Sequence, residues 1–252
     1  MNAQTPIIAG AEPTRLAVPK KNWGTALGAL RRLLRDKDAT EEVFEIMRAL
    51  NGDSTRKGYQ RLLATAEGGR LAYAREELAQ KLADRVWLAT LPPGSLGATY
   101  RDFTDTGGVT PQGLVAVSSH VMMDIEHPVA WFGRRIRDSH DLWHVTTGYG
   151  FDSLGEACLV AFSYAQTRSL GWAFIAVGAA LKSRKAPTRQ PYVAAIREGY
   201  TRGKAARWLP AQDWTALLPL PLADVRARLG LNPALVYQSI PVELRGEAVP
   251  KG

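Results

Sequence analysis

Apolar side chains recur every three or four residues along most of the chain, the spacing that gathers them on one face of an α-helix. Residues 23–36 combine this spacing with arginines, and residues 39–52 repeat it before ending at Gly52. The side chains expected to face inward are Leu27, Leu30, Leu33 and Leu34 in the first segment and Val43, Ile46, Met47 and Leu50 in the second. Two amphipathic helices are therefore predicted near the start of the chain.

Helical spacing continues toward the C-terminus. Residues 54–69 and 70–87 each predict one helix, and the stretch "LPPGSLG" at 91–97 breaks the pattern. Further helices are predicted over residues 98–108, 127–147, 152–170, 192–208 and 222–230, with an apolar segment at 170–181 and a basic loop after it. No run of alternating apolar and polar residues indicates strands. The predicted fold class is all-α, a single-domain multi-helix bundle.

Domain boundaries follow from where this periodicity starts and stops. Residues 1–20 contain three prolines and no helical spacing, which predicts a flexible N-terminal segment. Residues 21–240 are interpreted as one all-helical domain, and residues 241–252 as a flexible C-terminal tail. A chain of 252 residues is long enough for one large domain, and neither internal repeats nor low-complexity tracts indicate a second one.

Charge and cysteine content narrow the function classes. The net charge of +8 favours anionic partners such as nucleic acid, an acidic membrane surface or a phosphorylated small molecule. No nucleic-acid-binding motif accompanies the charge, so nucleic acid is not expected as a partner. A lone cysteine, Cys158, excludes an internal disulfide framework and fits a reducing compartment.

Membrane insertion and export are not expected. No stretch reaches the ~18 consecutive apolar residues of a membrane-spanning helix, and the first 20 residues have the character of neither a signal peptide nor a transit peptide. The apolar segment 170–181 beside a basic loop suits contact with an acidic membrane surface, although a buried helix and a solvated loop explain both features as well. The predicted location is the cytoplasm of a bacterium, peripheral to the inner face of the membrane.

Candidate chemistry is concentrated in residues 140–156. Two of the four histidines, His140 and His144, are one helical turn apart, with Asp141 beside them. Relative to His140, Asp141 lies about 100° and His144 about 40° around a helix, so the three side chains share one third of its circumference. Two histidines at this spacing can bind one metal ion. If the chain reverses in the turn at 148–153, the next helix returns Glu156 to the same face.

The resulting donor set is two nitrogens and two oxygens. Four such ligands suit tetrahedral zinc, whereas two histidines with one carboxylate would also suit iron(II). Asp141 stands where the zinc-hydrolase motif H-E-x-x-H has its general-base glutamate. Being one methylene shorter, it is better placed to share the metal or orient an imidazole than to activate a water, which weighs against a hydrolase.

Structural explanations compete with the metal site. Glu156 lies at capping-box spacing from Ser153 and could satisfy a backbone N–H there. Asp141 could pair with Arg137 one turn earlier, and the two histidines could form a solvated face. Cys158 is about 200° past Glu156 and should face away from the site. The scarcity of histidine elsewhere favours the metal interpretation.

The pattern H-D-x-x-H, eleven residues, then E resembles the signature of the coenzyme Q biosynthesis proteins called the "Coq-four" family. The matching stretches are "RIRDSHDLWHVTTG" and "LGEACLVAFSYAQT", with "LPPGSLGATYRDFTDTGGVTP" upstream and "YVAAIREGYTRGKAARWLPAQDWTALLPLPLADVRARLGL" downstream. The similarity covers roughly residues 85–232. The resemblance implies an all-helical protein with zinc, or another divalent metal, bound by His140, Asp141, His144 and Glu156, and a hydrophobic channel that binds a polyprenyl lipid tail.

Two functions are compatible with this resemblance. In the first, the chain is a metal-dependent enzyme that uses the same four residues for oxidative decarboxylation at ring carbon C1 of a polyprenyl-hydroxybenzoate-type intermediate of ubiquinone synthesis. In the second, it is a non-catalytic, lipid-binding scaffold that gathers the other ubiquinone biosynthesis enzymes at the membrane. The implied partners are the prenylated benzoquinone-precursor lipid, those enzymes and the membrane surface, with homo-oligomer formation left open.

Overall fold

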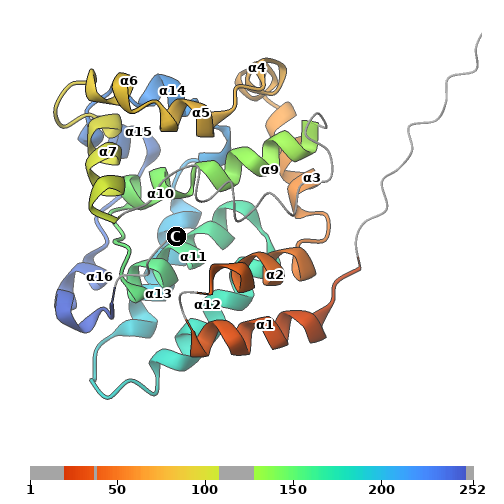
Figure 1. The fold of residues 1–252 in the computed structure, drawn as a ribbon, viewed down its shortest axis with the longest axis vertical. Helices are drawn as coiled ribbons and strands as arrows, with labels where there is room; N and C mark the ends of the chain where they lie inside the picture. Colours follow the sequence, from red (N-terminus) through yellow and green to blue (C-terminus); the bar gives the residue numbers. More distant parts are fainter. Residues whose placement is uncertain (1–19, 37–38, 108–127, 248–252) are drawn as a thin grey trace, which may run out of the picture.

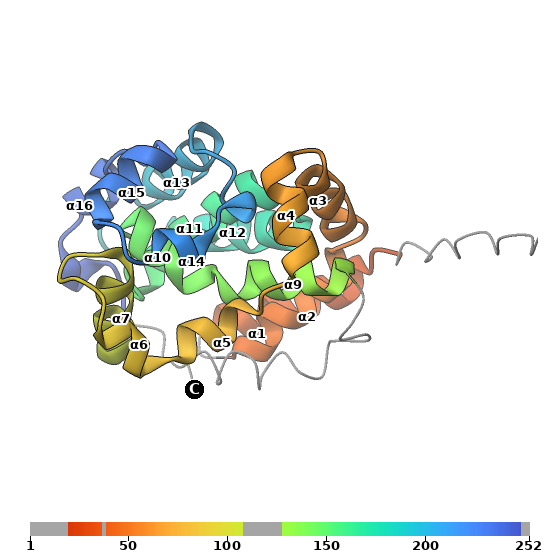
Figure 2. The same cartoon turned by 90° about the horizontal axis from the view of Figure 1, so that it is seen from above.

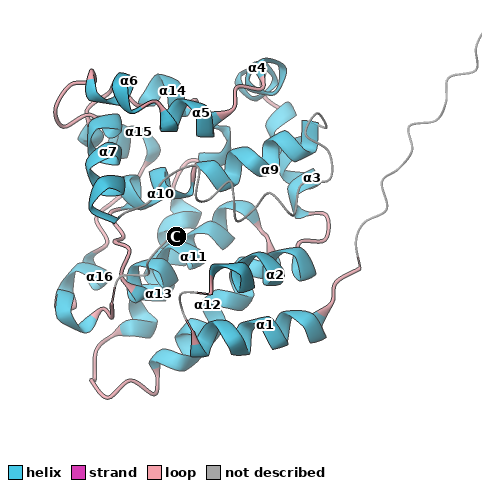
Figure 3. Cartoon of the chain, viewed as in Figure 1, coloured by secondary structure: helices cyan, strands magenta, loops and turns pink. Residues whose placement is uncertain are grey.

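The computed structural model describes residues 20–36, 39–107 and 128–247. Helices account for all the regular structure in these residues, where the only β-type contact is an isolated antiparallel bridge between Ser95 and Pro221 (Figure 3). The all-α prediction is therefore confirmed. In chain order the helices are α1 (Trp23–Arg35), α2 (Thr40–Leu50), α3 (Ser54–Leu63), α4 (Ala66–Ala74), α5 (Leu78–Ala83), α6 (Arg85–Ala89), α7 (Leu96–Gly107), α9 (Pro128–Asp138), α10 (His140–Thr147), α11 (Ser153–Thr167), α12 (Leu170–Ser183), α13 (Tyr192–Ala205), the 3-10 turn η2 (Leu209–Ala211), α14 (Trp214–Leu217), α15 (Leu222–Leu229), α16 (Leu235–Ser239) and the 3-10 turn η3 (Val242–Leu244).

Helix α11 is the centre around which the others assemble (Figure 1). It is buried on nearly every side, and it packs against α12 and α13. Helices α1 and α2 pack on each other and on α12. Seen from above, α13 and α15 lie on one side of α11 and α12, and α1 and α2 lie on the other (Figure 2). Burial of a helix all round requires small or apolar residues throughout, as "SLGEACLVAFSYAQT" supplies.

Helices α11 and α13 approach closely because α13 has glycines at the contact. A Cβ added at Gly203 would lie 2.7 Å from the carbonyl oxygen of Phe162 and 2.9 Å from the Cβ of Ala165, and Gly199 meets the backbone of Cys158 in the same way. The missing side chains allow the two backbones to touch, and Gln166 uses this proximity to donate a 2.6 Å hydrogen bond to the Gly203 carbonyl. The glycine pair therefore sets the distance between the two helices.

One long predicted helix is three short ones. Residues 70–87, together with the end of the preceding prediction, form α4, α5 and α6 instead. Thr65 caps α4 by accepting from the Gly68 N–H, Arg75 ends it in the left-handed conformation (φ 46°), and Asp84 caps α6 by accepting from the Trp87 N–H. Local side-chain caps thus override the continuous apolar spacing.

The leucine stripe predicted for α1 is also only partly buried. Leu30 is in the core, but Leu27 is exposed and Ala26 and Ala29 are fully buried. The buried side of α1 thus carries small residues, which allow close packing, and Leu27 lies on the exposed side. In α2 the predicted face is correct for Ile46 and Leu50.

The C-terminal residues reach back to the central helix. Beyond the last predicted helix the chain forms α16 and η3, and the backbone N–H groups of Ser153 and Leu154 donate to the carbonyls of Glu247 and Arg245. These bonds satisfy N–H groups at the start of α11 that have no partner within the helix. Among the described helices, none combines the length and hydropathy needed to cross a membrane.

Replacing Gly203 by alanine should destabilise the protein by about 1–3 kcal/mol, because the added methyl group overpacks the contact between α11 and α13. Gly69 is the matched control, since a Cβ there meets nothing within 4 Å. Gly69→Ala should be neutral or stabilise by up to about 1 kcal/mol. Urea unfolding followed by circular dichroism measures both changes. Equal stability of the two variants would contradict the proposed close contact.

Candidate metal centre

A break in the chain direction precedes the histidine pair. The predicted helix over 127–147 is divided at Ser139 into α9 and α10, and the Ser139 hydroxyl donates to the carbonyl of Ile136 at 3.0 Å. His140 is consequently the first residue of α10. At the other end Gly148 adopts φ 80° and donates its N–H to the His144 carbonyl at 2.8 Å, which ends the helix. The turn that follows leads directly into α11.

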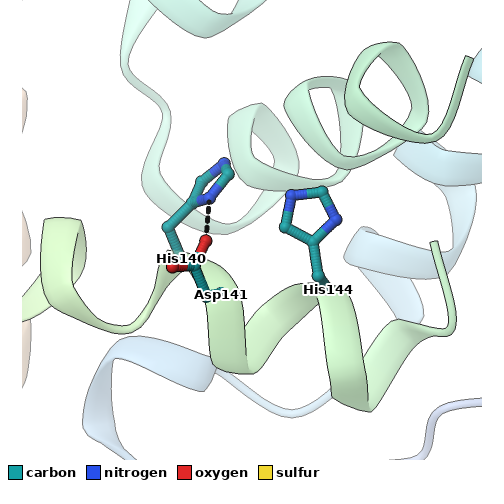
Figure 4. Close-up of side chains that lie close together, drawn as sticks. All are labelled: His140, Asp141 and His144. Atoms are coloured by element: carbon teal, nitrogen blue, oxygen red, sulfur yellow. Dashed lines mark hydrogen bonds and ion pairs between the residues drawn. The ribbon is translucent and has the colours of Figure 1, made fainter. Parts of the chain in front are cut away.

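His140, Asp141 and His144 form a compact cluster on α10. Their potential ligand atoms all lie within 4.8 Å of one another, and the three side chains rise from the same side of the helix (Figure 4). His140 Nδ1 is 3.3 Å from a carboxylate oxygen of Asp141. The side chains of His140, Asp141 and His144 are 16%, 5% and 0% exposed. The site is therefore buried at His144 and opens toward solvent at His140.

Glu156 reaches this cluster from α11. Its Oε1 lies 3.3 Å from Nε2 of His144, and its side chain is 19% exposed. The turn at 148–152 brings the two helices together as the chain reversal requires. The structure thus gathers His140, Asp141 and His144 in one cluster and places Glu156 against one of them, His144.

The protonation pattern of His144 follows from its hydrogen bond. Nδ1 lies 3.1 Å from the backbone carbonyl of Tyr149, and because a carbonyl only accepts, Nδ1 carries the proton. In the neutral ring Nε2 then presents a lone pair, and it is buried with no hydrogen-bond donor among the described residues. It faces a carboxylate oxygen, which is also an acceptor. Two acceptors at this distance need positive charge between them, either a proton or a metal cation.

The donor set fits a metal ion. Two imidazoles and two carboxylates supply the N2O2 ligands that suit zinc, and the same groups suit iron(II). The Nδ1–carbonyl bond of His144 is the type of support that a ligating histidine receives in metal sites. His140, Asp141 and His144 could therefore hold one divalent cation, with Glu156 beside His144.

Aromatic rings surround the cluster, and the sequence analysis did not identify them. Phe103 and Phe151 stack on each other at 4.0 Å between ring centroids and contact the His144 ring at 5.7 and 5.2 Å. Trp172 of α12 lies parallel to His140 at 6.2 Å. Single aromatics on separate elements leave no periodic signal. Their apolar surface limits water around the ligands, which strengthens electrostatic interactions there.

A buried phenol lies near the acidic side of the cluster. Tyr100 is 1% exposed, and burial together with the Asp141 carboxylate raises the pKa of its hydroxyl. The hydroxyl therefore stays protonated beside the site.

The capping-box explanation of Glu156 is wrong. Asp152, not Ser153, caps α11 by accepting from the Gly155 N–H at 2.8 Å, and the Ser153 N–H bonds to Glu247. Tyr237 further donates its hydroxyl to the other oxygen of Asp152. Because Asp152 serves the backbone, Glu156 projects toward His144 instead.

Two other neighbours have separate roles. Cys158 is fully buried and lies at the contact with α13, so it faces away from the cluster as expected; burial raises the pKa of its thiol. Arg137, the proposed partner of Asp141, forms an ion pair with Asp138 at 2.6 Å.

Comparison with known proteins identifies the family. The family model described as "Coenzyme Q (ubiquinone) biosynthesis protein Coq4" matches residues 22–234. The mitochondrial ubiquinone biosynthesis protein COQ4 of Pyricularia oryzae is 29% identical over 172 residues, which cover 68% of this chain and 55% of that protein. Its counterpart in Neurospora crassa is 29% identical over 175 residues, covering 68% and 48%. The chain thus matches about half the length of these relatives.

A solved structure supports the fold. The crystal structure of a candidate ubiquinone biosynthesis protein from Nostoc punctiforme PCC 73102 superposes with a TM-score of 0.60 over 84% of this chain and 100% of that chain, at 23% identity. At this identity the similarity is informative about the all-helical architecture alone.

The predicted location is wrong. The curated relatives are mitochondrial proteins of fungi rather than bacterial cytoplasmic proteins. Charge and cysteine count could not distinguish these locations, because a reduced cysteine and a basic surface are compatible with either one. The identification of the family itself rests on the match to residues 22–234 and on the curated relatives. The chain belongs to the Coq4 family of coenzyme Q (ubiquinone) biosynthesis proteins.

Proposed function

We propose that the chain is a metal-dependent enzyme of ubiquinone biosynthesis that performs oxidative decarboxylation at C1 of a polyprenyl-hydroxybenzoate-type intermediate. The observation that carries this proposal is the pair of facing acceptors, His144 Nε2 and Glu156 Oε1 at 3.3 Å, beside His140 and Asp141. Such an arrangement is suited to a divalent cation, and the accessible edge at His140 leaves a side from which a substrate can approach. We propose zinc as the metal, with iron(II) as the alternative.

The proposed reaction breaks the bond between the ring and its carboxyl group, releases CO2 and forms a C–O bond at the same carbon. Two electrons leave the ring, so with dioxygen as acceptor and water completing the balance, the products are the phenol, CO2 and hydrogen peroxide. A bound divalent cation would supply Lewis acidity toward a substrate carboxylate or phenolate.

The chain's own residues would position these groups. Asp141 lies 3.3 Å from His140 Nδ1, where it can hold that ring in place. The Tyr149 carbonyl fixes the proton of His144 on Nδ1. The rings of Phe103, Phe151 and Trp172 would limit water at the reacting centre. The proposed function also includes a hydrophobic channel that binds the polyprenyl tail and leads to these three rings.

A second candidate function is the lipid-binding scaffold, and one surface favours it. Trp23 and Leu27 of α1 and Val177 and Leu181 of α12 are exposed, and Trp23 contacts Phe174 edge-to-face, which joins the two helices. We call these four residues the α1–α12 face. Exposed cations occur in or just after the same two helices, among them Arg31 in α1, Lys182 in α12, and Arg184 and Lys185 after it. An apolar surface beside cations suits an anionic lipid surface.

Glu156→Gln and Asp141→Asn should each weaken metal binding by about 10- to 100-fold and abolish C1 conversion, because each removes one negatively charged ligand. Asp224→Asn, an exposed acid on α15, makes the same charge change away from the site and should leave both properties unchanged. Elemental analysis gives metal content, and mass spectrometry of a supplied prenylated hydroxybenzoate gives conversion. Full conversion by metal-free Glu156→Gln protein would exclude the metal-dependent reaction, and no conversion by metal-loaded wild type would favour the scaffold.

Removal of the metal should lower the thermal stability of the protein. A ligand that binds only the folded state at 100 times its Kd contributes about 2.7 kcal/mol, so treatment with a chelator should lower Tm by several degrees and zinc should restore it. Differential scanning calorimetry of the wild type and of His144→Ala provides the comparison. The variant's Tm should not respond to zinc. An unchanged Tm in the wild type would contradict a bound metal.

Val177→Ser with Leu181→Ser should reduce binding to vesicles containing an anionic phospholipid while metal content stays unchanged, because the α1–α12 face loses apolar surface. Leu235→Ser and Val242→Ser, two exposed apolar positions elsewhere, serve as the matched control. Vesicle co-sedimentation measures binding. If both pairs bind vesicles as the wild type does, this face has no role in lipid contact.

A further inference from the structure

The C-terminal end of α10 is held by arginines from two distant helices. The last four carbonyls of an α-helix have no partner within it. In α10 the His144 carbonyl accepts from the Gly148 N–H, and the next three accept from guanidinium groups. Arg226 of α15 donates to the carbonyls of Val145 and Thr146 at 2.9 and 3.0 Å, and Arg202 of α13 donates to that of Thr147 at 2.8 Å.

These contacts are needed because α10 is buried. All its residues after His140 are buried, so water has little access to the terminal carbonyls. A buried carbonyl without a hydrogen bond is costly. A positive charge at this end also interacts favourably with the partial negative charge of the helix terminus. The arginines therefore decide where the end of α10 can lie.

Arg202 also reaches the residue that orients His144. Its guanidinium carbon lies 4.9 Å from the centre of the Tyr149 ring, and its Nε donates to the Asn232 carbonyl at 2.9 Å. The backbone carbonyl of the same tyrosine accepts the Nδ1 proton of His144 at 3.1 Å. A continuous series of contacts thus runs from α13 to the imidazole, on the side opposite the Nε2 that faces Glu156.

The two cations are close enough to repel each other. Burial lowers the pKa of the Arg226 guanidinium, and the charge of Arg202 lowers it further. Two neighbouring like charges, one buried and one partly buried, would be unfavourable without compensation. The compensation in this structure is the row of carbonyls at the end of α10, which makes that helix end the element that both arginines act on.

We propose that Arg202 and Arg226 are positioning residues for the metal centre, which hold α10 so that His144 Nε2 stays directed at Glu156. The inference rests on the proposed metal site. It gives α13 and α15 a part in shaping the metal site, although none of the four proposed ligands lies on these helices.

The experiment measures zinc affinity by competition with a chelator, together with the visible absorption of Co2+ bound in place of zinc, which reports ligand geometry. Arg226→Met keeps an unbranched apolar stem but removes the guanidinium group and with it both hydrogen bonds. We expect affinity to fall by about 10-fold or more, the effect seen when outer residues of a metal site are removed, and the Co2+ spectrum to change. Arg226→Lys keeps the positive charge but cannot donate to both carbonyls in the same geometry. Its zinc affinity should lie between those of the wild type and Arg226→Met.

Arg135→Met is the matched control. Arg135 is buried, as Arg202 is, and also donates to a backbone carbonyl, but that carbonyl belongs to Gln212 and not to α10. It should lower stability and leave zinc affinity and the Co2+ spectrum unchanged. Arg226 is only partly buried, so its variants should fold; if Arg226→Met does not, Arg226→Lys decides alone.

The outcomes separate the inference from the function. If the wild type binds neither Zn2+ nor Co2+, the proposed metal function fails. If the wild type binds metal and the Arg226 variants bind it equally well with the same spectrum, only the positioning role is overturned. The same holds if Arg135→Met weakens binding as much as Arg226→Met, because the effect would then be one of general stability.

Discussion

The hydrogen bond between His144 Nδ1 and the carbonyl of Tyr149 is the interaction on which the site depends. It assigns the ring proton, and by doing so it leaves Nε2 as an acceptor aimed at a carboxylate oxygen. Because Nδ1 already carries a proton, Nε2 can meet the Glu156 carboxylate only through a second proton or a metal cation. A single backbone carbonyl, placed by the turn that follows α10, therefore changes a buried histidine into a ligand-type group.

That carbonyl is in place because the surrounding packing restricts the turn. Asp152 caps α11 and also accepts a hydrogen bond from the Tyr237 hydroxyl. The same hydroxyl accepts a hydrogen bond from the Gly150 N–H at 3.0 Å. Arg202 contacts the Tyr149 ring from α13. Gly199 and Gly203 allow α13 to pack closely on α11, and this packing sets the distance of Arg202 from the metal centre. Core packing and site geometry are thus parts of one arrangement, in which a shift of one helix would move a ligand.

Much of the fold could be predicted from local patterns. Helical spacing locates most helices, and it places His140, Asp141 and His144 on one side of α10, as the structure shows. Local patterns failed where a side-chain cap competed with the spacing, as at Thr65 and Asp84, or where small residues packed better than leucines, as in α1. In each case the deciding interaction is a side-chain hydrogen bond or the packing of another helix, and apolar periodicity describes neither.

The sequence by itself determined the helical class, the three ligand-type residues of one helical turn and the family pattern, because these depend on spacing within a few residues. Only the tertiary structure decided that Glu156 meets His144, that Tyr149 orients the imidazole, and that Arg202 and Arg226 hold the end of α10. Except for the bond from His144 to the Tyr149 carbonyl in the following turn, those contacts join residues on different helices, up to 81 positions apart. Their geometry is set by how whole helices pack, and no short stretch of sequence contains that information.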